Sequence, residues 1–328
     1  MRTSRITPRS TIRPPRLGIV TAVLASVSLL LSACSGAADA TTGTAGGTNT
    51  SPGQHRVKVT KDAAAALLPE AIRQRGTIII GAGFGAGDPP LGFYADDNKT
   101  PIGIEVDIAH LVADKLGVKL DLQVTSWENL FIGLDSGKYD AGFYNITVTE
   151  ARKEKYDFAT YRKDNISFEA RKGTGWTVKT RRDIAGKTIA VASGTNQEKI
   201  LVDWNTSNVK AGLPKATIKY YQSQTDTYLA LASGRIDAYL GPNPSGAYHV
   251  ATGHQSQIIG TFSGAGDGLQ GLIAATTKKH NGVVNALAAA LNSAVADGTY
   301  AKVLQRWNLT NEAVTTSQIN PPGLPKTS

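Results

Sequence analysis

Arg152 is the residue whose sequence surroundings point most directly to chemistry. It follows Thr149 by three positions, and a threonine there is a favourable N-cap, so we expect a helix from Thr149 through Tyr156 with Arg152 in its first turn. At that position the guanidinium and the free N–H groups of the helix start can converge on one anion. A planar guanidinium matches a carboxylate particularly well, through two parallel hydrogen bonds. The alternative is a surface arginine paired with an acid.

Most other chemistries lack the residues that they need. The chain has 1 cysteine, Cys34, which excludes an intrachain disulfide, and its 5 histidines lie far apart without metal-binding spacing. We therefore expect no metal and no cofactor. A glycine-rich stretch at 81–87 suggests a dinucleotide loop, but Asp88-Pro89-Pro90 follows where that loop would open a helix. Neither a phosphate-binding Gly-x-x-x-x-Gly-Lys motif nor a Gly-x-Ser-x-Gly nucleophile motif occurs.

The charge balance gives no indication of nucleic-acid binding. The 328 residues carry a formal charge of +9, but five arginines fall within the first 16 residues. Without that segment, 30 basic residues face 26 acidic ones, and the formal charge is +4. A value this small over a long chain favours solubility and does not require a polyanionic partner. With 41% hydrophobic and 19% charged residues, the composition is that of a globular protein of about two domains.

The N-terminus predicts export. Five arginines precede an apolar run over 17–31, which is too short for a membrane-spanning helix and is typical of a secretory signal. Its end, Leu31-Ser32-Ala33-Cys34, resembles the lipobox of bacterial lipoproteins, which implies a signal peptide over 1–33 and a lipidated Cys34 on the outer face of the cell membrane. The alternatives are a plain signal peptide or an uncleaved anchor. Small and polar residues follow, so we expect a flexible tether over 34–69.

Strand and helix patterns alternate through the remaining chain, which predicts an α/β fold with mainly parallel sheets in two batches. One expected helix, for example, carries Ile104, Ile108, Leu111 and Val112 at helical spacing. The expected strands are 77–80, 120–124, 140–144, 187–192, 216–221, 236–240, 257–262 and 269–276. The expected helices are 105–116, 126–137, 149–156, 196–204, 226–233, 245–251, 283–295 and 299–307.

Several short motifs keep a common order and spacing over some 230 residues. They are Pro89-Pro90-Leu91-Gly92-Phe93 with Gly103-Ile104-Glu105-Val106-Asp107, Trp127-Glu128-Asn129-Leu130, Leu134-Asp135-Ser136-Gly137, Ile146-Thr147-Val148-Thr149-Glu150-Ala151-Arg152, Ile184-Ala185-Gly186-Lys187, Ser193-Gly194-Thr195-Asn196, Gly234-Arg235-Ile236-Asp237-Ala238 and Asp297-Gly298-Thr299-Tyr300. Together they resemble the polar amino-acid branch of the bacterial solute-binding proteins that serve ABC importers.

The resemblance implies a two-lobed, periplasmic-binding-protein-like α/β fold. Each lobe is then a mainly parallel sheet flanked by helices, and two crossing strands join the lobes near 162–168 and 262–268. Lobe one would comprise 70–163 plus 266–320, lobe two 168–260, and a C-terminal tail 321–328. Such proteins close around a small ligand between the lobes.

The resemblance also implies a set of ligand-binding residues. Arg152 matches the arginine that binds the ligand's α-carboxylate. Asn145 and Thr147 match positions that hydrogen-bond the ligand, and Tyr144 matches a neighbouring contact. Trp127 matches a pocket wall, and Thr195 and Asn196 match the lobe-two loop that donates to the carboxylate. The alternative for the loop residues is ordinary turn chemistry between a strand and a helix.

The chain departs from the family at the group that accepts the ligand's α-ammonium. The family usually has an aspartate after the Gly-Arg-x-Asp-Ala strand, whereas Pro242 stands there in Gly241-Pro242-Asn243-Pro244. Asp88 replaces an aromatic residue in the first loop, where it can hold a cation or simply cap a turn. Either Asp88, Tyr144 or Asn243 supplies the acceptor, or the preferred ligand has a blocked, secondary or missing amine. The sequence slightly favours the second interpretation.

These observations predict a lipid-anchored, monomeric binding subunit that delivers an amino acid or a related carboxylate to an ABC permease, without enzymatic activity. Two alternatives are a ligand sensor and an enzyme on the same fold, since dehydratases of cyclic carboxylates resemble this family. An enzyme needs a carboxylic acid of raised pKa in the cleft. Glu169 is the candidate, although a solvated charge on a strand is the expected role.

Overall fold

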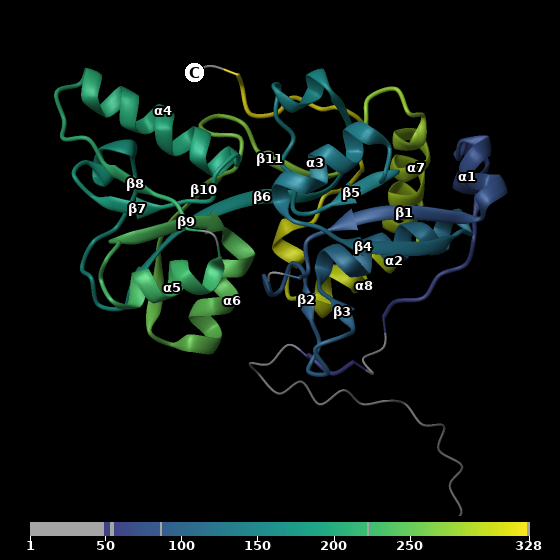
Figure 1. Ribbon diagram of the computed structural model, residues 1–328, viewed down its shortest axis with the longest axis horizontal. Helices are drawn as coiled ribbons and strands as arrows, with labels where there is room; N and C mark the ends of the chain where they lie inside the picture. The colour runs from purple at the N-terminus through teal and green to yellow at the C-terminus, as the bar shows by residue number, and fades with distance from the viewer. Residues whose placement is uncertain (1–48, 53–55, 86, 222, 327–328) are drawn as a thin grey trace, which may run out of the picture. The chain divides into compact units, whose positions relative to one another are not determined.

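The structure, a computed structural model, describes residues 49–52, 56–85, 87–221 and 223–326 (Figure 1). Cys34, the predicted signal peptide and the first part of the predicted tether lie outside these residues, so lipid attachment remains a prediction. Within the described ranges, none of the helices has the length and apolar character needed to cross a bilayer.

One sheet runs through the folded unit (Figure 1). Within the described residues it has nine strands in the order β4-β1-β5-β11-β6-β9-β7-β8, with β10 also paired to β6. The bounds are Thr77–Ala82 (β1), Lys119–Val124 (β4), Ala141–Phe143 (β5), Tyr156–Arg171 (β6), Thr188–Ala190 (β7), Thr217–Lys219 (β8), Ala238–Pro242 (β9), Ser256–Ser263 (β10) and Gly271–Lys278 (β11). A separate ribbon pairs β2 (Phe93–Tyr94) with β3 (Pro101–Ile102).

The sheet has a parallel group at each end and antiparallel strands in the middle. β1 pairs in parallel with β4 and β5, and β7 pairs in parallel with β8 and β9. The 16-residue strand β6 lies between these groups, antiparallel to β11 up to Asp164 and to β10 from Asn165 onward. The turn between β10 and β11 returns beside it, with the Gly264 N–H donating to the Asp164 carbonyl at 2.9 Å. The chain therefore passes between the two halves along β6 and returns through this turn.

Each half has its own hydrophobic core, which defines two lobes. The core of lobe one includes Ile80, Ile108 and Leu287, each with 0% of its surface exposed. The core of lobe two is a separate cluster around Phe168 and Ile189. The predicted two-lobed α/β fold is thus confirmed.

The helices begin and end where the sequence provides caps. The Ser126 hydroxyl accepts the Asn129 N–H at the start of α3, and Gly137 ends that helix with a left-handed φ of 75°. Lobe one carries α1 (Glu70–Arg75), α2 (Ile104–Leu116), α3 (Trp127–Ser136), α7 (Val283–Ala296) and α8 (Thr299–Arg306), and lobe two carries α4 (Asn196–Lys210), α5 (Gln224–Ala232) and α6 (Asn243–Gly253). Short 3-10 helices are η1 (Ala63–Leu67), η2 (Arg152–Glu154), η3 (Arg181–Ile184) and η4 (Thr310–Glu312).

The helix predicted from Thr149 through Tyr156 is wrong. Only the single 3-10 turn η2 forms, and Tyr156 already begins β6, opposite Lys278 of β11. The backbone before η2 is held elsewhere, because the Glu150 N–H donates to the Leu324 carbonyl at 2.9 Å and the Leu324 N–H donates to the Val148 carbonyl at 3.1 Å. The helix ends because Tyr156 and the residues after it pair with β11, a strand from a distant part of the chain.

The folded unit also begins earlier than the predicted tether allows. Asp62 caps η1 by accepting the Ala64 N–H at 2.8 Å, and η1 packs against α7. Leu68 is only 3% exposed. The last part of the stretch assigned to the tether, from Asp62 to residue 69, is therefore packed onto lobe one.

Candidate ligand-binding site

A cavity of about 210 Å³ lies between the two lobes. Its lining includes six residues predicted as ligand contacts, namely Asp88, Trp127, Tyr144, Asn145, Thr195 and Asn196. Pro242 also lines it, whereas Thr147, Arg152 and Asn243 do not. Its volume is below the ~300 Å³ at which pockets for drug-sized ligands begin, so the cavity suits a small molecule.

Aromatic rings form the lobe-one wall. The Trp127 ring stands edge-on to that of Tyr144 with centroids 5.6 Å apart. Gly83 permits this packing, because a Cβ there would lie 2.0 Å from the Tyr144 ring. Burial, reinforced by the charge of Asp88, raises the pKa of Tyr144 to about 12, so the phenol is neutral at physiological pH.

Arg152 lies behind this wall and contacts both lobes. Its guanidinium carbon is 5.0 Å from the centroid of the Trp127 ring, a cation–π contact. One terminal nitrogen donates to the Thr147 carbonyl at 2.9 Å in lobe one, and the other donates to the Gly194 carbonyl at 3.2 Å in lobe two. Burial lowers the pKa of Arg152 to about 10, which still leaves the side chain charged at neutral pH.

Asp164 gathers two of the predicted ligand contacts. Its Oδ2 accepts from the Thr147 hydroxyl at 2.7 Å and from the Asn196 side-chain amide at 3.1 Å, so one oxygen bridges the lobes. Asp164 is 1% exposed, and burial raises its pKa to about 6. We call Thr147, Arg152, Asp164 and Asn196 the hinge cluster, because they surround the passage of the chain between the lobes.

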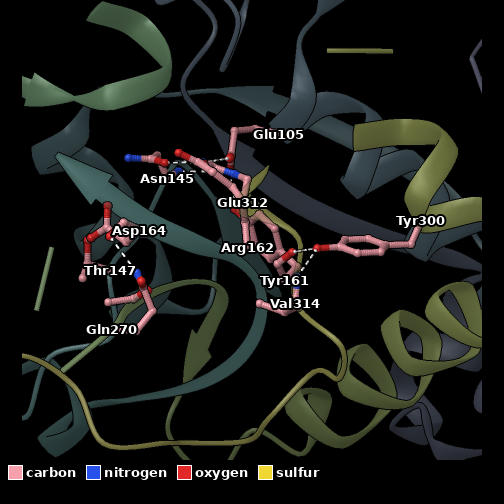
Figure 2. A network of polar contacts seen from close by, with 11 residues as sticks. Glu105, Asn145, Thr147, Tyr161, Arg162, Asp164, Gln270, Tyr300, Glu312 and Val314 are labelled. Atoms are coloured by element: carbon pink, nitrogen blue, oxygen red, sulfur yellow. Dashed lines mark hydrogen bonds and ion pairs between the residues drawn. The ribbon is translucent and has the colours of Figure 1, made fainter. Parts of the chain in front are cut away.

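A second buried network positions Asn145 (Figure 2). Asn145 has a left-handed φ of 49°; its N–H donates to Glu105 at 3.0 Å, and its side-chain oxygen accepts from Arg162. Arg162 also pairs with Glu105 at 3.1 Å and with Glu312, and all three are at least 97% buried. The network thus joins α2, β6 and η4 behind the cavity.

Sequence reasoning missed Glu105, Arg162, Asp164 and Glu312. No local signal singled out Arg162 and Asp164, because β6 carries six charged residues among its 16. Charged side chains are almost never fully buried unless they are paired. Partners, however, come from segments as far as 150 residues away, which local patterns do not reveal.

Asp88 is placed differently from the hinge cluster. It lines the cavity from the loop after β1, and its Oδ1 accepts the Gln224 side-chain amide of lobe two at 2.8 Å. Burial raises the pKa of Asp88, an effect that its hydrogen bonds only partly oppose. Asn243, by contrast, begins α6 outside the cavity lining.

The expectation that Glu169 is a solvated strand charge is wrong. Glu169 is 1% exposed, and its Oε1 lies 2.5 Å from both the His249 ring nitrogen and the Ser256 hydroxyl. His249 stacks on Tyr228 with ring centroids 3.6 Å apart. Glu169 does not line the cavity.

An α/β fold of two lobes around an interlobe cavity defines the class of two-lobed binding proteins. Residues 80–310 match the bacterial extracellular solute-binding proteins, family 3, and the chain belongs to this family. The resemblance drawn from the sequence motifs is thereby confirmed.

The curated proteins to which the chain is similar are named as amino-acid-binding proteins. The chain is 35% identical over 174 residues to the L-cystine-binding protein TcyJ of Escherichia coli (strain K12), covering 53% of this chain and 61% of that protein. The match therefore spans about three fifths of that relative. The ABC transporter arginine-binding protein 1 of the same strain is 25% identical over 239 residues, covering 70% of this chain and 90% of the relative.

Solved structures show the same fold. An ancestral arginine-binding protein bound to arginine superposes with a TM-score of 0.62 and 27% identity, over 71% of this chain and 98% of that one. The ancestral amino acid-binding protein AncCDT-1, described as a precursor of cyclohexadienyl dehydratase, gives a TM-score of 0.60 at 25% identity, over 74% of this chain and 98% of that one.

Proposed function

We propose that the chain is the substrate-binding subunit of an ABC importer, which captures an amino acid or an amino-acid-like carboxylate and delivers it to a membrane permease. The observation that carries the proposal is a small cavity lined by residues of both lobes. Arg152 lies next to this cavity and hydrogen-bonds to each lobe. Family membership and the names of the relatives support it.

Arg152 is the proposed partner of the ligand carboxylate. A guanidinium offers five N–H donors, and its bonds to the Thr147 and Gly194 carbonyls use two of them. Asn145 and Thr195 line the cavity from opposite lobes and supply further polar contacts. Trp127 and Tyr144 provide the apolar wall. Thr147 and Asn196 act through Asp164, which their side chains already contact.

Ligand binding is proposed to close the lobes, because the lining residues come from both of them. Small-angle scattering with and without saturating ligand measures this directly. A smaller radius of gyration in the bound state is expected, and an unchanged radius with a confirmed ligand contradicts closure.

The proposed location is the outer face of the cell membrane, through lipid on Cys34, with a monomeric protein docking onto permease subunits. The lipobox-like end of the apolar run supports the anchor. Cys34→Ala, expressed in a lipidating bacterium, is expected to leave the membrane fraction. Retention in that fraction at wild-type amounts contradicts the anchor.

A dehydratase is the second candidate function. The binding protein AncCDT-1 is named as a precursor of a dehydratase, and the observation that favours an enzyme here is Asp88, a cavity-lining carboxyl group of raised pKa. We propose binding without turnover. Product formation from cyclohexadienyl carboxylates, lost in Asp88→Asn, would reverse this preference.

A thermal-shift screen tests the main proposal. The panel holds free amino acids, N-blocked derivatives and amine-free carboxylates, with Arg152→Ala as the matched variant. A ligand at 100 times its Kd stabilises the folded state by about 2.7 kcal/mol. We expect at least one panel member to raise the melting temperature of the wild type and not that of the variant.

A further inference from the structure

Asp88 is the one charged side chain among the residues described as lining the cavity. The other polar lining groups are amides, hydroxyls and phenols, such as those of Asn145, Thr195 and Tyr239. The cavity therefore presents a single negative charge, and nothing in its described lining balances that charge.

The carboxylate of Asp88 has little compensation from the protein. Its side-chain partners are neutral: the Ser245 hydroxyl and the Gln224 amide, the latter at 2.8 Å, lower its pKa without supplying a positive charge. Arg162 lowers the pKa of Asp88 only slightly, and Glu105 opposes it. A desolvated carboxylate without a counter-charge is costly, so a cation entering the cavity gains a partner that the protein does not provide.

The rest of the lining fits a cation as well. Trp127, Tyr144, Tyr221 and Tyr239 all line the cavity, and aromatic faces attract ammonium and guanidinium groups. Pro242 lines it at the end of β9 and offers no side-chain acceptor. An acid for the ligand's cation is thus absent at the end of β9 and present in the loop after β1.

We propose that Asp88 is the specificity-determining acceptor for a cationic group of the ligand, an ammonium or a guanidinium, with Gln224 closing over it from lobe two. This inference rests on the proposed function and names the charge class of its ligand. If the cation is the α-ammonium, it reverses the sequence-based preference for a blocked, secondary or missing amine.

Four probes distinguish the source of the cation. L-arginine carries an α-ammonium and a guanidinium, L-glutamine only the ammonium, N-acetyl-L-arginine only the guanidinium, and N-acetyl-L-glutamine neither; all four keep the carboxylate. Calorimetry compares the wild type with Asp88→Asn. The matched control is Asp96→Asn, an exposed acid on the same segment, which lies outside the cavity lining.

The wild type is expected to bind at least one cationic probe more tightly than N-acetyl-L-glutamine. Truncating one partner of a buried charge pair weakens binding by roughly 30-fold or more, so Asp88→Asn is expected to lose at least that for each cationic probe bound at this site. Loss for both free amino acids assigns the α-ammonium, and loss for both arginine probes assigns the guanidinium. Asp96→Asn should match the wild type within threefold.

Equal weakening of all four probes by Asp88→Asn, or weakening of none, overturns the inference while the proposed function stands. Failure of the wild type to bind any probe contradicts the amino-acid class itself and the inference with it. The double variant Asp88→Asn/Pro242→Asp guards against a folding defect. Position 242 is the N-cap of α6, where aspartate is favourable, so recovered affinity for cationic probes supports a charge requirement.

Discussion

The two buried acids between the lobes, Asp164 and Asp88, differ in the hydrogen-bond partners of their carboxyl groups. Asp164 lies in the hinge cluster, where one of its oxygens accepts from Thr147 of lobe one and Asn196 of lobe two. Asp88 lines the cavity, and its partners, the Gln224 amide and the Ser245 hydroxyl, are both neutral groups of lobe two. Both carboxyl groups have a raised pKa because they are buried, yet only Asp88 is in a position to meet a ligand.

The difference separates two roles that a buried carboxylate can have. An acid surrounded by protein donors fixes the positions of those donors, so Asp164 holds the loop of Thr147 and the start of α4 in register. An acid that faces a cavity has fewer protein donors, so part of its desolvation cost is uncompensated. A ligand of opposite charge can offset that cost. Burial and pKa alone do not distinguish these roles; the partners do.

Replacing Arg152 is expected to have the largest effect. Arg152→Ala should weaken all four carboxylate probes by about 30- to 5,000-fold, because each presents the same anion. Asp88→Asn should not weaken binding of N-acetyl-L-glutamine, which carries no cation. The two variants therefore distinguish recognition of the carboxylate from recognition of the cation. Calorimetry measures this, with Arg181→Ala as control, since Arg181 bonds Asn208 at 2.8 Å outside the cavity lining. A loss of affinity below threefold would show that Arg152 does not bind the ligand.

Much of the fold was predictable because its signals are local. The cap at Ser126, the stop at Gly137 and the apolar face of α2 each lie within one element, and all appear as expected. The helix expected at Thr149 is cut short because the chain from Tyr156 onward pairs with β11, far along the sequence. Pairing between distant segments is not encoded in local periodicity.

The site was predictable only as far as the family motifs reach. Trp127, Asn145 and Thr195 line the cavity as the motif spacing implies. Asp164 was missed, and Glu169 was expected to be solvated, because a charged residue in a strand suggests a solvated face. Whether such a charge is buried depends on partners such as Asn196 and His249, which only the fold brings close.

Adding a methyl group beside Asp164 tests how tightly the hinge cluster is packed. A Cβ at Gly264 would lie 1.7 Å from Asp164 Oδ2, while one at Gly253 would have its nearest neighbour at 3.8 Å. Overpacking of this kind costs about 1–3 kcal/mol. We expect Gly264→Ala to lower the free energy of unfolding by that amount in urea melts and Gly253→Ala to leave it nearly unchanged. Equal stability of the two variants would show that the hinge cluster accommodates the added methyl group at little cost in free energy.

Truncating the two acids directly contrasts their roles. Asp164→Ala leaves the Thr147 hydroxyl and the Asn196 amide without their shared acceptor, and unsatisfied buried groups cost about 1–3 kcal/mol. Asp88→Ala removes a poorly compensated charge and should change stability little while it impairs binding of cationic probes. Urea melts and calorimetry on both variants give the comparison. Similar stability losses would show that both acids are structural.

The smallest expected effect is the pH dependence of stability. Asp164 has a folded-state pKa of about 6 against an ordinary value of 3.8, so the folded state binds its proton more tightly than the unfolded chain does. Its contribution is therefore fully present below the unfolded pKa and is lost as the pH rises through 6. Between pH 7 and pH 5 the wild type should gain about 1 kcal/mol from this group. Asp164→Asn cannot titrate and should lack that part of the gain, whereas Asp96→Asn should retain it. Parallel stability curves for the wild type and Asp164→Asn over this range would show that the carboxyl group of Asp164 is as acidic in the folded protein as in the unfolded chain, and that its hydrogen bonds fully offset its burial.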